Sequence, residues 1–132
     1  MRSALEELAA RLAVERISDD QLDGLAALID GMRDAAARGD AHEETLVDVA
    51  FHAAIVEAAG NAVLERQWLQ LQPYARTFVT VVLPHQDLGA VPERHLPILE
   101  ALRRRDADDA AAAIRAHLAE AADLLQPLAA RG

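Results

Sequence analysis

Residues 46–61, LVDVAFHAAIVEAAGN, form the stretch that decides the fold of this chain. Between residues 46 and 59 only three side chains are polar, and these are Asp48, His52 and Glu57. A helix with so few polar positions must bury most of its circumference, so we expect it inside a bundle of other helices. Gly60 and Asn61 end it, because both residue types tolerate the left-handed backbone conformation.

Two of these polar residues share one face of the expected helix. Asp48 and His52 are four positions apart, which places them one above the other, and Ile55 continues the same stripe. A carboxylate and an imidazole are therefore directed toward the interior, where an unpaired polar group costs about 2–7 kcal/mol. A metal ion is one partner that would satisfy both groups.

The composition of the chain favours a single helical domain over residues 1–132. Hydrophobic residues make up 52% of the sequence and aromatic residues only 3%, so alanine, leucine and valine must fill the core. Such small side chains suit closely packed helices, and alanine is the strongest helix former. Glycine and proline are few and fall mostly between segments of helical periodicity, and no segment shows a strand pattern.

Charge and residue types exclude several functions. The net charge of −9 argues against a nucleic-acid surface, because such binding depends on lysine and arginine neutralising phosphates. Without cysteine there are no disulfides or thiolate ligands, so a metal must be held by nitrogen and oxygen atoms. No apolar run reaches the roughly 18–20 residues of a membrane span, and the start of the chain lacks the apolar core of a signal peptide. We therefore predict a soluble, cytoplasmic domain with no membrane partner.

Periodic apolar residues and helix-end signals predict six helices in an antiparallel bundle. The first helix is expected to bury a stripe made of Leu5, Leu8, Leu12 and Ile17. Ser18 and Gln21 form a capping box at the start of the second helix. Pro73 falls within the fourth helix and should kink or split it, which would give seven helices. The expected helices span residues 3–17, 19–37, 41–59, 62–82, 92 to 104 or 105, and 107–125, with 83–91 as the longest connection.

Two of the later helices each carry a histidine within an apolar stripe. His95 and His117 both have apolar residues at helical spacing along the chain. Three helices thus direct four potential ligands toward one interior: Asp48, His52, His95 and His117. Three imidazoles and one carboxylate suit zinc, nickel, iron or manganese. The pattern leaves open that the histidines are hydrogen-bonded core residues, with Asp48 and His52 pairing with each other.

Four segments together resemble the FCD domain, the C-terminal effector-binding domain of the FadR subfamily of GntR transcription regulators. The segments are RSALEELAARLA at residues 2–13, DVAFHAAIVEAAGN at 48–61, ERHLPILEAL at 93–102 and RDADDAAAAIRAHL at 105–118. The resemblance covers residues 2–125, and its motifs are specific in combination. It implies an all-α antiparallel bundle of six or seven helices around a central cavity for ligand and metal.

The resemblance also implies what this cavity binds. In many members an aspartate and three histidines in these motifs bind a divalent metal, and the carboxylate of a small organic acid completes its coordination. The matching positions are Asp48, His52, His95 and His117, so we expect the chain in the metal-binding branch of the family. One ion per chain is expected, with zinc as the first choice and nickel, manganese or iron as alternatives.

Regulators of this family carry an N-terminal winged helix-turn-helix that binds DNA, and none precedes Arg2 here. We therefore interpret the sequence as an excised sensor domain or a naturally truncated protein. The resemblance leads us to expect a homodimer that contacts DNA only through the missing N-terminal domain.

Selectivity for one acid requires polar groups around the cavity besides the metal. Four residues are candidates for contacts with the ligand: Arg2, Arg76, Thr80 and Asn61. Arg2 matches the arginine of the family's R-x-x-L-E motif, and Arg76 and Thr80 follow the break at Pro73. Surface solvation is the alternative for both arginines, and helix termination is the alternative for Asn61. We expect the two other histidines, His42 and His85, to be solvated.

Three functions compete for the predicted site. The first is an effector sensor in which a metal and a small carboxylate bind together, and the second is a structural or dimerisation bundle with an internal metal staple. The third is a metal-dependent hydrolase or lyase, but the chain offers no obvious general base beside the metal apart from Glu93. Glu93 could also orient an imidazole from outside the metal, but we favour its interpretation as an exposed acid in the first turn of a helix. We therefore predict that the chain is not an enzyme.

Overall fold

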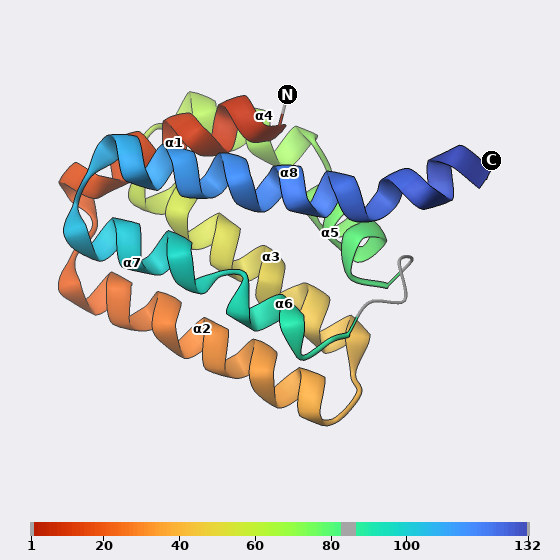
Figure 1. Cartoon of the computed structure of the whole chain (residues 1–132). Helices are drawn as coiled ribbons and strands as arrows, with labels where there is room; N and C mark the ends of the chain where they lie inside the picture. The colour runs from red at the N-terminus through yellow and green to blue at the C-terminus, as the bar shows by residue number, and fades with distance from the viewer. Residues whose placement is uncertain (1, 83–86, 132) are drawn as a thin grey trace.

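The computed structural model describes residues 2–82 and 87–131, and the regular secondary structure within these ranges is entirely helical. The helices form a bundle in which α1 and α8 lie along one side and α2 along the opposite side (Figure 1). The predicted all-α fold is confirmed. In chain order the helices are α1 (Arg2–Arg16), α2 (Asp19–Ala37), α3 (Ala41–Ala58), α4 (Ala62–Gln70), α5 (Pro73–Val82), α6 (Ala90–Glu93), α7 (Leu96–Arg104) and α8 (Ala107–Arg131).

The helix that decides the fold, α3, lies among the others as expected from its apolar sequence. It contacts α1, α2, α4 and α5, and Phe51, Ile55 and Val56 along it are buried. Asp40 caps its first turn by accepting a hydrogen bond from the backbone N–H of Glu43. Because neighbours cover several sides of α3, polar side chains on its inner face have no access to bulk water.

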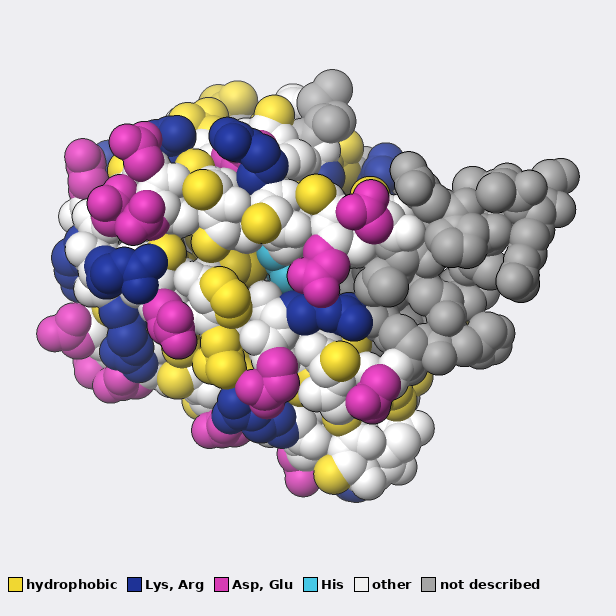
Figure 2. Space-filling view, in the orientation of Figure 1, with side chains coloured by type: hydrophobic (Ala, Val, Ile, Leu, Met, Phe, Trp, Pro, Cys, Tyr) yellow, Lys and Arg dark blue, Asp and Glu magenta, His cyan; other side chains and the backbone are white. Residues whose placement is uncertain are grey.

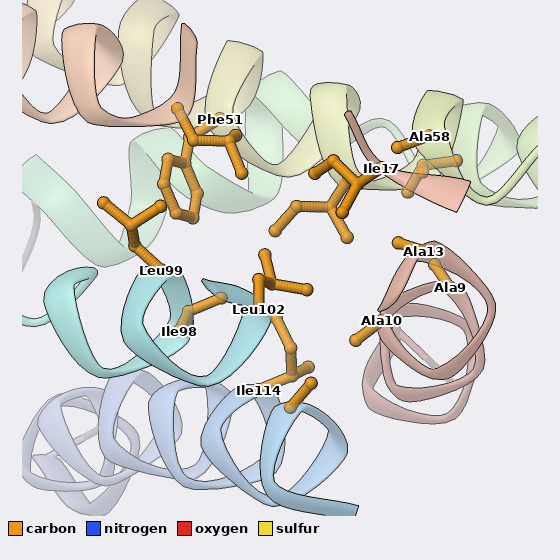
Figure 3. Close-up of a cluster of buried hydrophobic side chains, with 14 of the residues drawn as sticks. Ala9, Ala10, Ala13, Ile17, Phe51, Ala58, Ile98, Leu99, Leu102 and Ile114 are labelled. Carbon is orange, nitrogen blue, oxygen red and sulfur yellow. The ribbon is translucent and has the colours of Figure 1, made fainter. Parts of the chain in front are cut away.

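The hydrophobic core combines alanines with branched side chains. Figure 3 shows Ala9, Ala10 and Ala13 on the inward side of α1, with Leu102 of α7 and Ile114 of α8 nearby. All five side chains are fully buried. Alanines on α1 allow α8 to pack closely against it, as the composition predicted.

The buried face of α1 differs from the predicted one. Leu8 is 45% exposed, and Leu5 and Leu12 are only partly buried, so the leucine stripe is wrong except for Ile17. The helix instead buries three alanines and a valine together with the charged side chain of Glu6, namely Ala9, Ala10, Ala13 and Val14. The prediction failed because it treated the largest apolar residues as the core face, whereas the close contact with α8 requires small ones.

The predicted break at Pro73 divides the fourth helix into α4 and α5. Gln72 has a positive φ of 54°, which turns the chain between the two helices. Pro73 then occupies the first position of α5, where its missing N–H costs no intrahelical hydrogen bond.

The predicted helix from residue 92 to 104 is wrong at its start. The chain forms the single turn α6, leaves the helix at Arg94 and His95, and begins α7 at Leu96. Pro97 explains the interruption, because a proline inside a continuous helix would clash with the carbonyl group four residues earlier. His95 therefore lies at the N-cap of α7 and not within a helix.

The last helix, α8, runs through Pro127 to Arg131, whereas we predicted an end near residue 125. Proline removes one backbone hydrogen bond, but the alanine and leucine residues around it favour continued helix. Although α8 is 25 residues long, neither it nor any other helix in the described ranges is long and apolar enough to cross a membrane.

Candidate metal centre

Four side chains from three parts of the chain meet inside the bundle. Asp48 and His52 come from α3, His95 from the turn before α7 and His117 from α8. Each offers one potential ligand atom, and these four atoms lie within 4.8 Å of one another. The first three side chains are buried and His117 is partly buried. On the face shown in Figure 2, only a small area of histidine is visible between charged and apolar side chains.

The local structure explains why these side chains converge. One helical turn separates Asp48 from His52, so α3 presents both to the same neighbours. His95 lies in the interruption before α7, and its ring is fixed by a contact of 2.8 Å between Nδ1 and the carbonyl oxygen of Val91 in α6. His117 reaches the cluster from α8, and its ring centroid lies 4.4 Å from that of His95 and 5.2 Å from that of His52.

Asp48 is the acidic centre of the cluster. Its Oδ1 atom lies 3.0 Å from Nε2 of His95 and 3.3 Å from Nε2 of His52. Burial alone would raise the pKa of this carboxyl, but the charges and hydrogen bonds of His95 and His52 outweigh it and hold the pKa well below its usual value. Asp48 is therefore ionised and supplies the negative charge that a bound cation requires.

The outer nitrogens of two imidazoles are held by oxygen acceptors. Nδ1 of His52 lies 2.5 Å from Oε1 of Glu6, and Nδ1 of His95 faces the carbonyl of Val91. An acceptor at Nδ1 favours the tautomer with its proton there, which leaves the Nε2 lone pair facing the cluster. Both histidines are thus oriented as metal-binding histidines are.

Glu6 contacts the cluster, and we did not single it out from the sequence. Its carboxylate is 2% exposed and accepts hydrogen bonds from Nε of Arg2 at 2.6 Å and from Nε1 of Trp68 at 3.1 Å, besides its contact with His52. Burial alone would raise the pKa of Glu6, but the charges and hydrogen bonds of His52 and Arg2 lower it by a larger amount, so the net shift is downward. The available signal was the spacing of Arg2 and Glu6, which places an ion pair one turn apart on α1.

The pKa values of two imidazoles of the cluster are shifted in opposite directions. Burial would lower the pKa of His52, but the negative charges of Glu6 and Asp48 raise it to about 9. His117 has its pKa lowered well below the usual value, first by burial and then by the neighbouring imidazoles His95 and His52. Without a metal, His52 is therefore protonated near neutral pH, and a metal would have to displace the proton on its Nε2 atom to bind there, while His117 keeps a free lone pair.

The residues of the cluster fit a divalent metal. Nδ1 of His117 is buried and has no hydrogen-bond partner within residues 2–82 and 87–131, and the buried Nε2 of His52 has only its 3.3 Å contact with Asp48, which does not have the geometry of a good hydrogen bond. Buried polar atoms almost always have partners, and a cation among the four side chains would provide one. Three imidazole nitrogens and one carboxylate oxygen, without thiolate, suit zinc, nickel, iron or manganese.

The structure brings one of the four candidate ligand-contact residues to the edge of this cluster. Arg2 is mostly buried and binds Glu6, which in turn holds His52. Arg76 is exposed and donates to the carbonyl oxygen of Leu71, and the side chain of Thr80 lies outside the described residues. Asn61 is exposed and caps α4 by accepting a hydrogen bond from the N–H of Leu64.

The other polar residues considered in the sequence lie apart from the cluster. His42 is exposed as expected, and its Nδ1 is 2.5 Å from the hydroxyl oxygen of Tyr74. His85 lies outside the described residues. Glu93 is exposed and accepts a hydrogen bond from Nε of Arg33 at 2.9 Å, so it neither orients a histidine nor serves as a base at the cluster.

The family model of the FCD domain matches residues 1–120. A probable D-xylose utilization operon transcriptional repressor of Paenarthrobacter nicotinovorans is 31% identical over 119 residues, which cover 90% of this chain and 52% of the relative. The transcriptional repressor NanR of Escherichia coli K12 is 29% identical over 121 residues, covering 89% of this chain and 45% of NanR.

Two solved structures share the fold. McbR/YncC of E. coli superposes with a TM-score of 0.74 and 25% identity, covering 97% of this chain and 62% of that one. A GntR protein of Streptococcus agalactiae gives a TM-score of 0.68 and 28% identity, covering 88% of this chain and 52% of the other. The chain spans about half the length of the curated relatives that it matches.

This chain belongs to the FCD family, the effector-sensing domains of GntR-type transcription regulators. The predicted family is therefore confirmed. The relatives are named as transcriptional repressors and not as enzymes, which supports a regulatory domain over the hydrolase or lyase alternative.

Proposed function

We propose that this domain senses a small organic acid through one bound divalent metal, with Asp48, His52, His95 and His117 as its protein ligands. Zinc is the first choice for the ion, since it accepts imidazole and carboxylate ligands without geometric preference, and nickel, manganese or iron are alternatives. The observation that carries the proposal is the convergence of four ligand atoms within 4.8 Å inside the bundle.

The surrounding contacts support binding of a metal over a simple buried hydrogen-bond cluster. Glu6 and the carbonyl of Val91 hold the outer nitrogens of His52 and His95, which is the usual arrangement behind metal-binding histidines. Asp48 supplies an ionised oxygen, and His117 a nitrogen with its lone pair free. A metal held by four protein ligands would supply a further coordination position for a carboxylate oxygen, if it takes five or six ligands.

The side chains around the four metal ligands determine how the acid would bind. The Arg2 guanidinium donates a hydrogen bond to Glu6, whose other carboxylate oxygen contacts His52. We propose that Arg2 acts through Glu6 on the orientation of His52 and does not bind the acid itself. Arg76, Asn61 and Thr80 remain candidates only as more distant contacts.

We further propose that the domain acts within a longer, cytoplasmic, homodimeric regulator. The named relatives are transcriptional repressors about twice its length, so DNA binding is assigned to a region outside this chain. For the acid to change DNA binding, it must bind one arrangement of the dimer more tightly than the other, because equal affinity would shift no equilibrium.

Thermal unfolding with and without metal tests this function. The chelator-treated protein and the zinc-loaded protein are each melted with a panel of small carboxylic acids. A sensor is expected to gain stability from a few acids only when zinc is present, and to leave those acids chemically unchanged. Stabilisation by zinc with no response to any acid would instead favour the structural staple, and turnover of an acid would favour an enzyme.

A further inference from the structure

A second buried acid lies beside the cluster and has no assigned role. Glu44 is 0% exposed, and neither of its carboxylate oxygens has a hydrogen-bond partner in the part of the chain that the structure describes. Burial, followed by the negative charge of Asp48, raises the pKa of Glu44 to about 7. A buried carboxyl group without a partner costs free energy in either protonation state. A bound molecule that hydrogen-bonds to Glu44 would relieve this cost.

The location of Glu44 relates it to the proposed metal ligands. It precedes Asp48 by one turn on α3, so the two side chains share a face and lie about 6 Å apart along the helix axis. The nearby cation Arg94 favours ionised Glu44 electrostatically, but its Nε atom is 3.2 Å from Glu120. Glu44 is therefore a buried acid that has no hydrogen-bond partner in the described ranges and lies one helical turn from the proposed metal ligand Asp48.

We propose that Glu44 is a second anchor for the effector and hydrogen-bonds a hydroxyl group of an organic acid whose carboxylate binds the metal. This inference rests on the proposed function and adds the class of ligand, namely hydroxy acids in preference to unsubstituted ones. A hydroxyl group both donates and accepts, so it suits the carboxyl group of Glu44 whether or not that group is ionised. The separation of about one helical turn places the hydroxyl several carbons from the carboxylate.

Isothermal titration of the zinc-loaded chain with two six-carbon acids tests this inference. D-gluconate carries a hydroxyl on every carbon after the carboxylate, whereas hexanoate carries none. The quantity compared is the ratio of their dissociation constants in the wild type, Glu44→Leu, Glu44→Gln and the control Glu57→Leu. Glu57 is an exposed acid on the same helix. Any direct contact between gluconate and zinc is common to all four proteins and cancels in this comparison.

The wild type is expected to prefer gluconate, and Glu44→Leu to reduce that preference by about tenfold or more, as expected for loss of a hydrogen bond to a charged group. Glu44→Gln should keep most of the preference because its amide still hydrogen-bonds, and Glu57→Leu should keep all of it. Zinc content should be equal in all four proteins. Leucine removes a buried polar group without a large change in volume, so the variant should fold.

An unchanged ratio in Glu44→Leu, or a wild type that binds hexanoate as tightly as gluconate, would overturn the inference. If these acids still bind only in the presence of zinc, the proposed function stands and only the role of Glu44 is wrong. If the wild type takes up no zinc and binds neither acid, both the inference and the proposed function are wrong.

Discussion

Glu6 and Glu44 both have side chains that are almost inaccessible to solvent, yet their surroundings are opposite. Glu6 is held by Arg2, His52 and Trp68, and these partners lower its pKa despite its burial. Glu44 has no hydrogen-bond partner among the described residues, and burial beside Asp48 raises its pKa. The comparison teaches that a buried acid is part of the scaffold when the fold supplies its partners, and is open to a ligand when the fold does not.

The largest expected effect concerns the cluster between these two acids. His117→Ala removes a proposed ligand and should weaken zinc binding by more than about 100-fold, which exceeds the typical loss for a residue that only supports a ligand. Competition with a chromophoric chelator measures the affinity. His42→Ala serves as the control, because that exposed histidine lies outside the cluster. Equal affinities in the two variants would remove His117 from the proposed site.

The next effect tests whether Glu6 belongs to the scaffold. Glu6→Gln leaves the buried His52 and the Arg2 guanidinium without their counter-charge, so we expect a loss of about 3 kcal/mol in the free energy of unfolding. Zinc affinity should fall about 10–100-fold because His52 loses its orientation. Urea unfolding and the chelator assay give the two values.

A matched control is Glu15→Gln, which alters an exposed acid on the same helix and should change stability by less than about 0.5 kcal/mol. If Glu6→Gln is as stable as Glu15→Gln, the ion pairs around Glu6 contribute little and the contrast with Glu44 is lost.

Replacing Glu44 should raise the free energy of unfolding, whereas replacing Glu6 should lower it, and the gain at Glu44 should depend on pH. Its pKa rises from 4.5 in the unfolded chain to about 7 in the folded one, so the folded state holds the proton more tightly. Below pH 4.5 Glu44 is protonated in both states, so its ionisation costs no stability. Between pH 4.5 and 7 the unfolded state releases its proton first, and stability falls by up to about 3 kcal/mol.

Glu44→Gln removes this titration, so the variant should become more stable than the wild type as the pH rises from about 4.5 to 7. Urea unfolding of both proteins in chelator-containing buffer at pH 5 and pH 8 measures the difference. A difference that stays the same at the two pH values would mean that Glu44 is already paired in the folded protein.

The smallest effect concerns the face of α1 opposite Glu6. Leu8 is 45% exposed, so Leu8→Ser should change the stability of the monomeric unit by less than about 0.5 kcal/mol. Leu102→Ala, in the fully buried core, should cost about 2–5 kcal/mol in the same urea assay. Similar losses in both variants would contradict the corrected packing of α1.

Much of the fold was predictable because its signals are local. The apolar sequence around Asp48 and His52 predicted a buried helix, and the capping box of Ser18 and Gln21 is present at the start of α2. Pro73 marked a real break between α4 and α5. Pro97 carried an equally local signal for the start of α7, but the prediction did not use it.

The site was predictable only in part because its support is not local. The spacing of apolar residues selected Asp48, His52, His95 and His117, which the structure brings together. Glu6 was missed because His52 and Trp68, which stabilise its burial, are 46 and 62 residues away in the sequence. Glu44 was missed because an acid in the first turn of a helix is usually explained by the helix dipole.

Anomalous X-ray scattering from crystals of the zinc-loaded protein would test the central claim most directly. Data collected above and below the zinc absorption edge should show one strong peak per chain, about 2.0–2.2 Å from ligand atoms of Asp48, His52, His95 and His117. A zinc-loaded crystal with no peak among these four side chains, or with its only peak on the surface, would contradict the proposed metal centre.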